Sequence, residues 1–142
     1  MFDIFNKNIK EAKQDNNLFI NIGALLIHVA KIDENYSEKE KEIIKKTLLE
    51  LGLSNDSLNN IFKKSEEVER NSNQILEFTK EVKNKDEAFK IKIVKALWRI
   101  IYADNISDMY EASLMRRLTG LLYLDSKIVG DIKNEVKKNF SE

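Results

Sequence analysis

Hydrophobic residues along this chain recur mainly three and four residues apart, and no segment sustains the strict alternation of a half-buried strand. This spacing predicts a short amphipathic helix at about residues 2–13. Two further segments, at about 17–31 and 86–102, have apolar residues around most of the helix circumference. A helix that is apolar nearly all round lies in the interior of a protein, so we expect these two helices to be central.

Capping residues mark several helix boundaries. Ser37 is followed three residues later by Glu40, and Asp108 by Glu111, and each pair forms a capping-box pattern that predicts a helix start. Gly52 is a typical helix end. Further helices are expected at about 55–69, around residues 75–82 and after Asp125. The chain is therefore predicted to be all-α, a single compact bundle of about seven or eight helices.

Composition agrees with this prediction and narrows the possible functions. The chain has 142 residues, no proline and four glycines, which disfavours an all-β fold. Its length fits one domain, residues 1–142, with residues 1–15 as a helix that flanks the core. The absence of cysteine excludes disulfides and cysteine-based zinc sites. The 24 basic and 24 acidic residues balance, so no overall field favours nucleic acid as a partner.

No segment predicts membrane insertion or export. The longest apolar stretch, about residues 19–32, contains Asn21 and Lys31 and is too short and too polar to span a bilayer. The N-terminus carries Asp3 and lacks a long apolar run, so we do not expect a signal peptide. These features predict a cytoplasmic protein without an integral membrane segment.

An internal repeat becomes visible when the sequence is shifted by 71 residues. Each copy consists of a buried helix that ends near an Asp, a short link, an N-cap residue and a Glu at the third helical position. Such a duplication predicts two pseudo-repeated helix–acidic loop–helix hairpins. The matched pairs are Leu26 with Leu97, Val29 with Ile100, Asp33 with Asp104, Ser37 with Asp108, Glu40 with Glu111, and Ile43-Ile44 with Leu114-Met115.

The acidic residues of these loops are open to two interpretations. Asp33 and Asp104 stand at predicted helix C-termini, where the helix macrodipole disfavours a carboxylate. Each Asp can accept hydrogen bonds from amides of the next helix, which is a purely structural role. Alternatively, the two Asp residues, together with the two Glu residues at positions 40 and 111, surround a cation with oxygen ligands. The EF-hand pattern is excluded, since Glu38 stands where that loop requires Gly.

Catalytic patterns are not evident. His28 is the only histidine, and its place on a buried helix predicts a core-edge residue with a local partner. Without cysteine or a second histidine, no residue is marked as a nucleophile, so an enzyme is not expected. Trp98 is predicted to pack in the core with its indole N–H satisfied. Arg116 and Arg117 are expected to be surface charges.

Several segments resemble the tellurite-resistance TerB-like family. The segment from Ala103 to Glu111, Ala-Asp-Asn-Ile-Ser-Asp-Met-Tyr-Glu, is similar to the Ala-Asp-Gly-x-x-Asp-x-x-Glu signature of that family. The resemblance covers about residues 17–140 and departs from the signature at Glu34 and Asn105, where the family has Gly. The other segments that carry it are Ala96-Leu97-Trp98-Arg99-Ile100, Leu76-Glu77-Phe78-Thr79 and Leu121-Leu122-Tyr123-Leu124.

This resemblance implies an all-α fold of repeated hairpins and a non-enzymatic binding module linked to tellurite resistance and stress responses. It also implies acidic loops that bind a divalent cation, such as calcium, magnesium or manganese. A protein partner, self-association or peripheral association with membrane-bound partners is expected. The alternative is a structural or oligomerising domain without a metal site. The residues that the resemblance marks as metal ligands are Asp33, Glu40, Asp104, Asp108 and Glu111.

Overall fold

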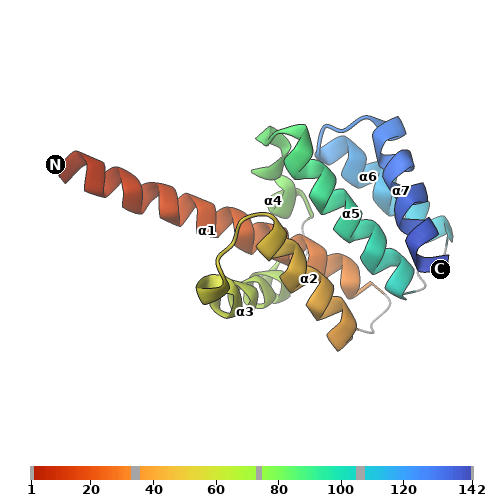
Figure 1. Cartoon of the computed structure of the whole chain (residues 1–142), viewed down its shortest axis with the longest axis horizontal. Coiled ribbons are helices and arrows are strands. Elements are labelled where there is room, and N and C mark those ends of the chain that lie inside the picture. The colour runs from red at the N-terminus through yellow and green to blue at the C-terminus, as the bar shows by residue number, and fades with distance from the viewer. Residues whose placement is uncertain (1, 33–35, 73–74, 105–107, 142) are drawn as a thin grey trace.

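The computed structural model describes residues 2–32, 36–72, 75–104 and 108–141, and it describes side chains within 16–32, 36–72, 76–103 and 111–139 (Figure 1). These residues form helices and turns without any strand, which confirms the all-α prediction. The elements are α1 (Phe2–Ala30), α2 (Glu38–Glu50), α3 (Asn55–Asn71), α4 (Ile75–Thr79), the 3-10 turn η1 (Val82–Asn84), α5 (Glu87–Asp104), α6 (Asp108–Leu121) and α7 (Ser126–Ser141).

The predicted break between a first helix at residues 2–13 and a second at 17–31 is wrong. Helix α1 runs without interruption from Phe2 to Ala30. The polar residues between the two apolar segments include neither glycine nor proline, so the backbone has no reason to leave the helix there. The first part of α1 projects away from the other helices (Figure 1).

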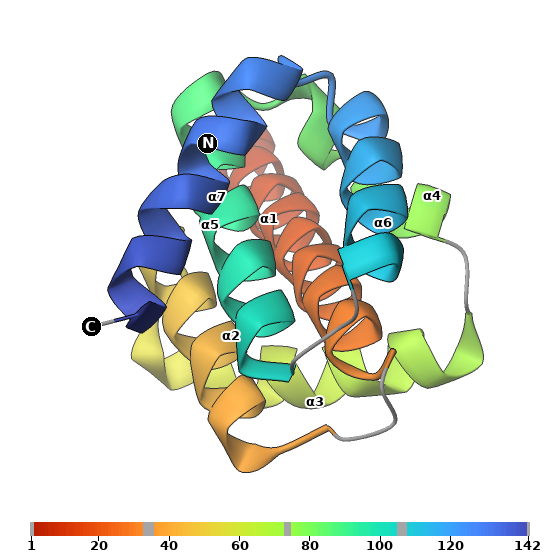
Figure 2. The same cartoon turned by 90° about the vertical axis from the view of Figure 1, so that its right-hand side faces the viewer.

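The two helices that were predicted to be central occupy the middle of the bundle. Helix α1 packs against α2, α3, α4 and α5, while α5 also packs against α2 and α7. Figure 2 shows α1 and α5 enclosed by the other helices. Apolar residues of α1 and α5, including Ile22, Leu26 and Leu97, are fully buried in one core cluster. The near-continuous apolar coverage of both segments is explained by this position.

The crossing of α1 and α3 depends on two small residues. A Cβ added at Gly23 would overlap the Ser65 side chain, since even the Ser65 Cβ would lie only 2.8 Å away. The Ser65 hydroxyl is buried and lies 3.0 Å from the Ile20 carbonyl oxygen of α1 and 2.9 Å from the Ile61 carbonyl oxygen of its own helix. The two backbones can therefore approach closely because Gly23 has no side chain.

Helices α2 and α6 end in the same backbone motif. At the end of α2, Leu53 N donates to Leu48 O and Gly52 N donates to Leu49 O, with Gly52 at φ +114°. At the end of α6, the N–H of Leu124 donates to the Thr119 carbonyl and that of Tyr123 to the Gly120 carbonyl, with Tyr123 at φ +57°. Both are Schellman motifs, in which a left-handed residue closes the helix.

Two further expectations concern the role of Trp98 and the insertion of a helix into a membrane. Trp98 is buried and its Nε1 donates to the Val129 carbonyl oxygen at 3.2 Å, so the predicted core role with a satisfied N–H is confirmed. Within the described residues, no helix has an apolar stretch long enough to cross a membrane.

Candidate acidic sites at the starts of α2 and α6

Glu40 completes the capping box that begins α2, as predicted. The Glu40 N–H donates to the Ser37 hydroxyl oxygen at 3.3 Å, while the Ser37 N–H and hydroxyl donate to Glu40 Oε1 at 3.1 and 2.7 Å. Both reciprocal bonds satisfy groups that a helix start otherwise leaves without partners. One carboxylate oxygen of Glu40 is thus fully used by the helix cap.

The second oxygen of Glu40 has no such role. Glu40 is only 2% exposed, and its Oε2 is buried without a hydrogen-bond partner among the described residues. Burying a carboxylate oxygen without a partner is unfavourable, and native structures rarely leave such an atom unsatisfied. The start of α2 therefore presents an oxygen that is suited to a ligand.

A tyrosine and further carboxylates surround this end of the bundle. Burial raises the pKa of the Tyr36 hydroxyl, and the carboxylates of Glu66, Glu40 and Glu69 raise it further. Tyr36 therefore stays neutral. The ammonium nitrogens of Lys41 and Lys31 lie 5.0 and 5.7 Å from the centre of its ring, which places two cations beside this acidic region.

Glu69 is a buried carboxylate that already has two side-chain partners, Lys31 and His28. Its Oε2 lies 2.7 Å from Lys31 Nζ and its Oε1 lies 3.4 Å from His28 Nδ1. These contacts join the C-terminal end of α1 to α3, where cationic groups are also favoured by the helix macrodipole. The prediction that His28 has a local partner at the edge of the core is confirmed.

Glu111, which stands 71 residues after Glu40 in the sequence, is in a different environment. It is 4% exposed and its Oε1 lies 2.8 Å from Lys133 Nζ of α7. The same ammonium nitrogen stands 5.3 Å from the centre of the Trp98 ring. Lys133 therefore supplies the positive charge that a cation would otherwise supply at Glu111.

The remaining predicted ligands lie largely outside the described part of the structure. Asp33 falls within residues 33–35, which are not described. Asp104 is the last residue of α5 and Asp108 is the first residue of α6, and the side chains of both are outside the described set. The second predicted capping box, between Asp108 and Glu111, depends on these side chains and stays a prediction.

The described residues alone do not assemble a cation site. Among them, no three His, Asp or Glu side chains gather closely enough to hold a metal ion. The chemistry of Glu40 nevertheless fits a hard cation, because its free carboxylate oxygen is the kind of ligand that calcium, magnesium and manganese prefer.

Three residues of these sites were missed from the sequence. Glu69 falls on the same face of α3 as Phe62 and Ser65. Helical spacing is therefore a signal that could have placed Glu69 on the buried side. Lys31 and Lys133 have no comparable signal, because their partners are distant in the chain: Lys31 and Glu69 are 38 residues apart. Such pairs depend on how the helices cross.

Comparison with known proteins identifies a family for most of the chain. The family model described as tellurite resistance protein TerB matches residues 19–134, which run from α1 into α7 and include both acidic loops. No curated protein and no solved structure matches the chain.

Proposed function

This chain belongs to the tellurite resistance protein TerB family, and from that membership we propose that it is a non-enzymatic binding module whose first acidic loop holds a divalent cation. The ligands would be Glu40 and Asp33, with calcium, magnesium or manganese as the ion. The buried Oε2 of Glu40, which lacks a partner among the described residues, is the observation that carries this proposal.

The two loops are proposed to differ in their capacity for a cation. Glu111 is neutralised by Lys133 at 2.8 Å, so a cation at the second loop would have to compete with an ammonium group. Glu40 has no ion pair with any described residue. Since an uncompensated buried carboxylate favours the arrival of positive charge, the first loop is the stronger candidate.

A binding role accounts for the buried carboxylates better than catalysis does. Glu69 and Glu111 are each paired with a lysine, and Glu40 is tied to the start of α2 through Oε1. A general acid or base must instead face the proton that it moves in a substrate site. In this setting an ion would stabilise the loop before α2 and thereby present it to a protein partner of the tellurite or stress response.

The alternative is a structural or oligomerising domain in which the acids only cap helices. The complete capping box between Ser37 and Glu40 favours this alternative, because it gives Glu40 a role without any ion. The two proposals differ in one measurable property, which is the response of stability to divalent ions.

Thermal unfolding of metal-stripped protein tests the proposal, with and without millimolar calcium, magnesium or manganese. An ion present at about 100 times its dissociation constant adds about 2.7 kcal/mol. For a chain of this length, this corresponds to an increase of roughly 5–10 °C in Tm. We expect such an increase in the wild type and its loss in Asp33→Asn.

Glu40→Gln and Glu38→Gln form a matched pair of variants for the same experiment. Gln keeps the capping box at position 40 but removes the charge, so the ion-dependent increase in Tm should vanish. Glu38 lies in the same helical turn, but its side chain is exposed, so Glu38→Gln should respond to ions like the wild type. If no ion raises the Tm of the wild type, the acids are helix caps and the structural alternative is correct.

A further inference from the structure

A cavity of about 270 Å³ lies at the end of the bundle where α5 and α7 begin, away from the acidic loops. Helices α5 and α7 pack together and run in the same direction, so their N-termini meet at this end (Figures 1 and 2). The cavity wall comes from the first turn of α5, the link between α6 and α7, and the first turn of α7. It consists of Glu87, Lys90, Tyr123, Leu124, Asp125 and Ile128.

Lys90 gives this cavity a buried positive charge. The residue is only 7% exposed, and its ammonium group forms no ion pair or hydrogen bond with any residue that the structure describes. Among the described residues, the Lys90 ammonium nitrogen faces the Tyr123 ring, whose centre lies 5.9 Å away. A buried ammonium group without a counterion is unfavourable, so this cavity favours an anionic ligand.

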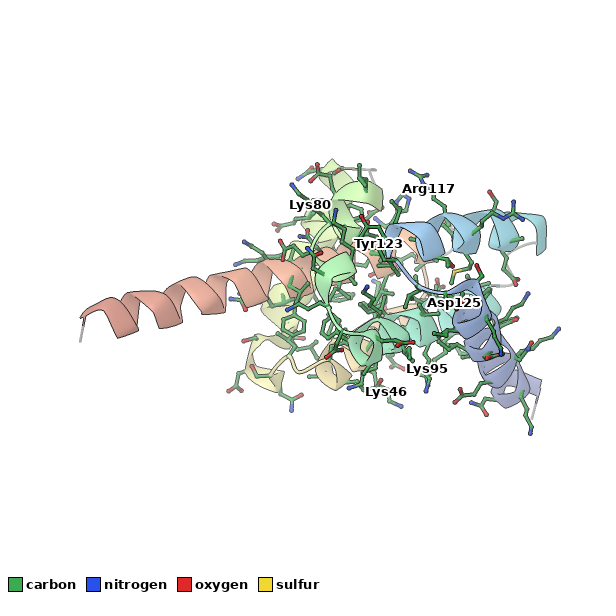
Figure 3. The ribbon with its side chains drawn as sticks, turned by 90° about the horizontal axis from the view of Figure 1, so that it is seen from above. Lys46, Lys80, Lys95, Arg117, Tyr123 and Asp125 are labelled. Carbon is green, nitrogen blue, oxygen red and sulfur yellow. The ribbon has the colours of Figure 1, made fainter. Side chains whose placement is uncertain are left out.

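Tyr123 forms an exposed aromatic wall beside this charge. It is 68% exposed and adopts the left-handed backbone conformation at φ +57°, which is unfavourable for a residue with a side chain. Lys83 Nζ lies 5.8 Å from the ring centre, so two ammonium groups flank the ring. Figure 3 shows Tyr123 and Asp125 on this part of the surface.

The other wall residues limit the charge of the ligand. Asp125 Oδ1 accepts from the Lys127 N–H at 2.9 Å and thereby caps α7, while Glu87 lies exposed in the first turn of α5. Two carboxylates in the wall disfavour a doubly charged phosphate group. Leu124 and Ile128 provide apolar surface, and the volume suits a group about the size of one amino-acid side chain.

We propose that this cavity binds a carboxylate carried on a small apolar body, with the carboxylate at Lys90 and the apolar part against Tyr123, Leu124 and Ile128. Either a free carboxylic acid or the C-terminus of a partner peptide presents this chemistry. The site is separate from the acidic loops, so it does not depend on the function proposed above.

Amide chemical shifts of the full chain, recorded by two-dimensional NMR, test the proposal. The free acid is probed with sodium isovalerate and the peptide terminus with N-acetyl-leucine, each against its neutral amide. We expect saturable shifts at Lys90, Tyr123 and Leu124 with the acids and at least about tenfold weaker binding of the amides, because the charge-assisted contact is lost. Binding of N-acetyl-leucine without isovalerate would assign the site to a peptide terminus, and the reverse would assign it to a free acid.

Lys90→Met and Lys63→Met provide the matched comparison. Lys90→Met keeps the length of the side chain but removes its charge, so binding of both acids should weaken at least about tenfold. Lys63 is exposed on α3, which does not line the cavity, and Lys63→Met should bind like the wild type. Equal shifts with acid and amide in the wild type, or no shifts with either acid, would overturn the proposal, and this comparison requires no variant to fold.

Discussion

The two halves of the bundle, α1–α3 and α5–α7, carry buried residues of different size at positions that are 71 residues apart. Helix α1 packs against α3 through Gly23 and Ser65, which allow the backbones to approach closely. The residues 71 positions later are Val94 and Val136, which are buried on α5 and α7. Small residues let the backbones of α1 and α3 approach closely, whereas the residues 71 positions later are larger apolar side chains that fill space in the core.

The acidic residues at the second helix of each half differ in a similar way. Glu40 closes a capping box and keeps one buried oxygen without a partner among the described residues, whereas Glu111 pairs with Lys133. A capping position therefore does not determine how its carboxylate is neutralised. The residues that reach it from other helices decide whether the charge is balanced internally or is open to a cation.

The largest expected effect is at the α1–α3 crossing. Gly23→Val should lower the free energy of unfolding by about 3 kcal/mol, because the new side chain overlaps Ser65. Val94→Ala in the other half should lower it by about 2 kcal/mol through the opposite cause, a cavity. Urea unfolding followed by circular dichroism measures both. If Gly23→Val changed stability by less than about 1 kcal/mol, the close approach of α1 and α3 would be contradicted.

A smaller effect is expected at Glu111. Lys133→Met leaves a buried carboxylate without its ammonium partner and should lower the free energy of unfolding by about 1–2 kcal/mol. This is below the value for a fully buried pair, because the Lys133 side chain is 39% exposed. Lys127→Met, an exposed lysine on the same helix, is the control and should change stability by less than about 0.5 kcal/mol. Equal effects of the two variants would show that the ion pair adds nothing.

The smallest expected effects are at the ends of α2 and α6, and they have opposite signs. Tyr123→Gly should raise the free energy of unfolding by about 0.5–1 kcal/mol, because it relieves the left-handed backbone at φ +57°. Gly52→Ala should lower it by about 1 kcal/mol, because φ +114° is unfavourable for a residue with a Cβ. Chemical denaturation of both variants measures these changes, and a loss of stability in Tyr123→Gly would mean that ring contacts outweigh the strain.

Local signals made much of the fold predictable from the sequence. The start of α2 followed from Ser37 and Glu40, its end from Gly52, and the start of α7 from Asp125, because each signal acts on neighbouring backbone groups. The continuity of α1 was missed because a polar stretch resembles a link when only the apolar pattern is followed. The Schellman motif at Tyr123 was also hidden, because Gly is its usual residue.

The candidate sites were less predictable, for a physical reason. The sequence placed Glu40 and Glu111 at equivalent helix positions, but it could not show that Lys133 reaches only the second of them. Likewise, the buried charge of Lys90 depends on the way in which the start of α7 covers α5. Contacts between distant segments arise from packing angles, which local patterns do not determine.

In the proposed function, the first acidic loop binds a divalent cation through Glu40, and the Lys133 ammonium group beside Glu111 keeps the second loop from binding another. Isothermal titration of metal-stripped protein with calcium, and in parallel with magnesium and manganese, measures the number of ions bound per chain. We expect one site per chain for at least one of these ions, and we expect it to be lost in Glu40→Gln and retained in Glu38→Gln. Two sites per chain, a site that survives Glu40→Gln, or no binding of any of the three ions would contradict it.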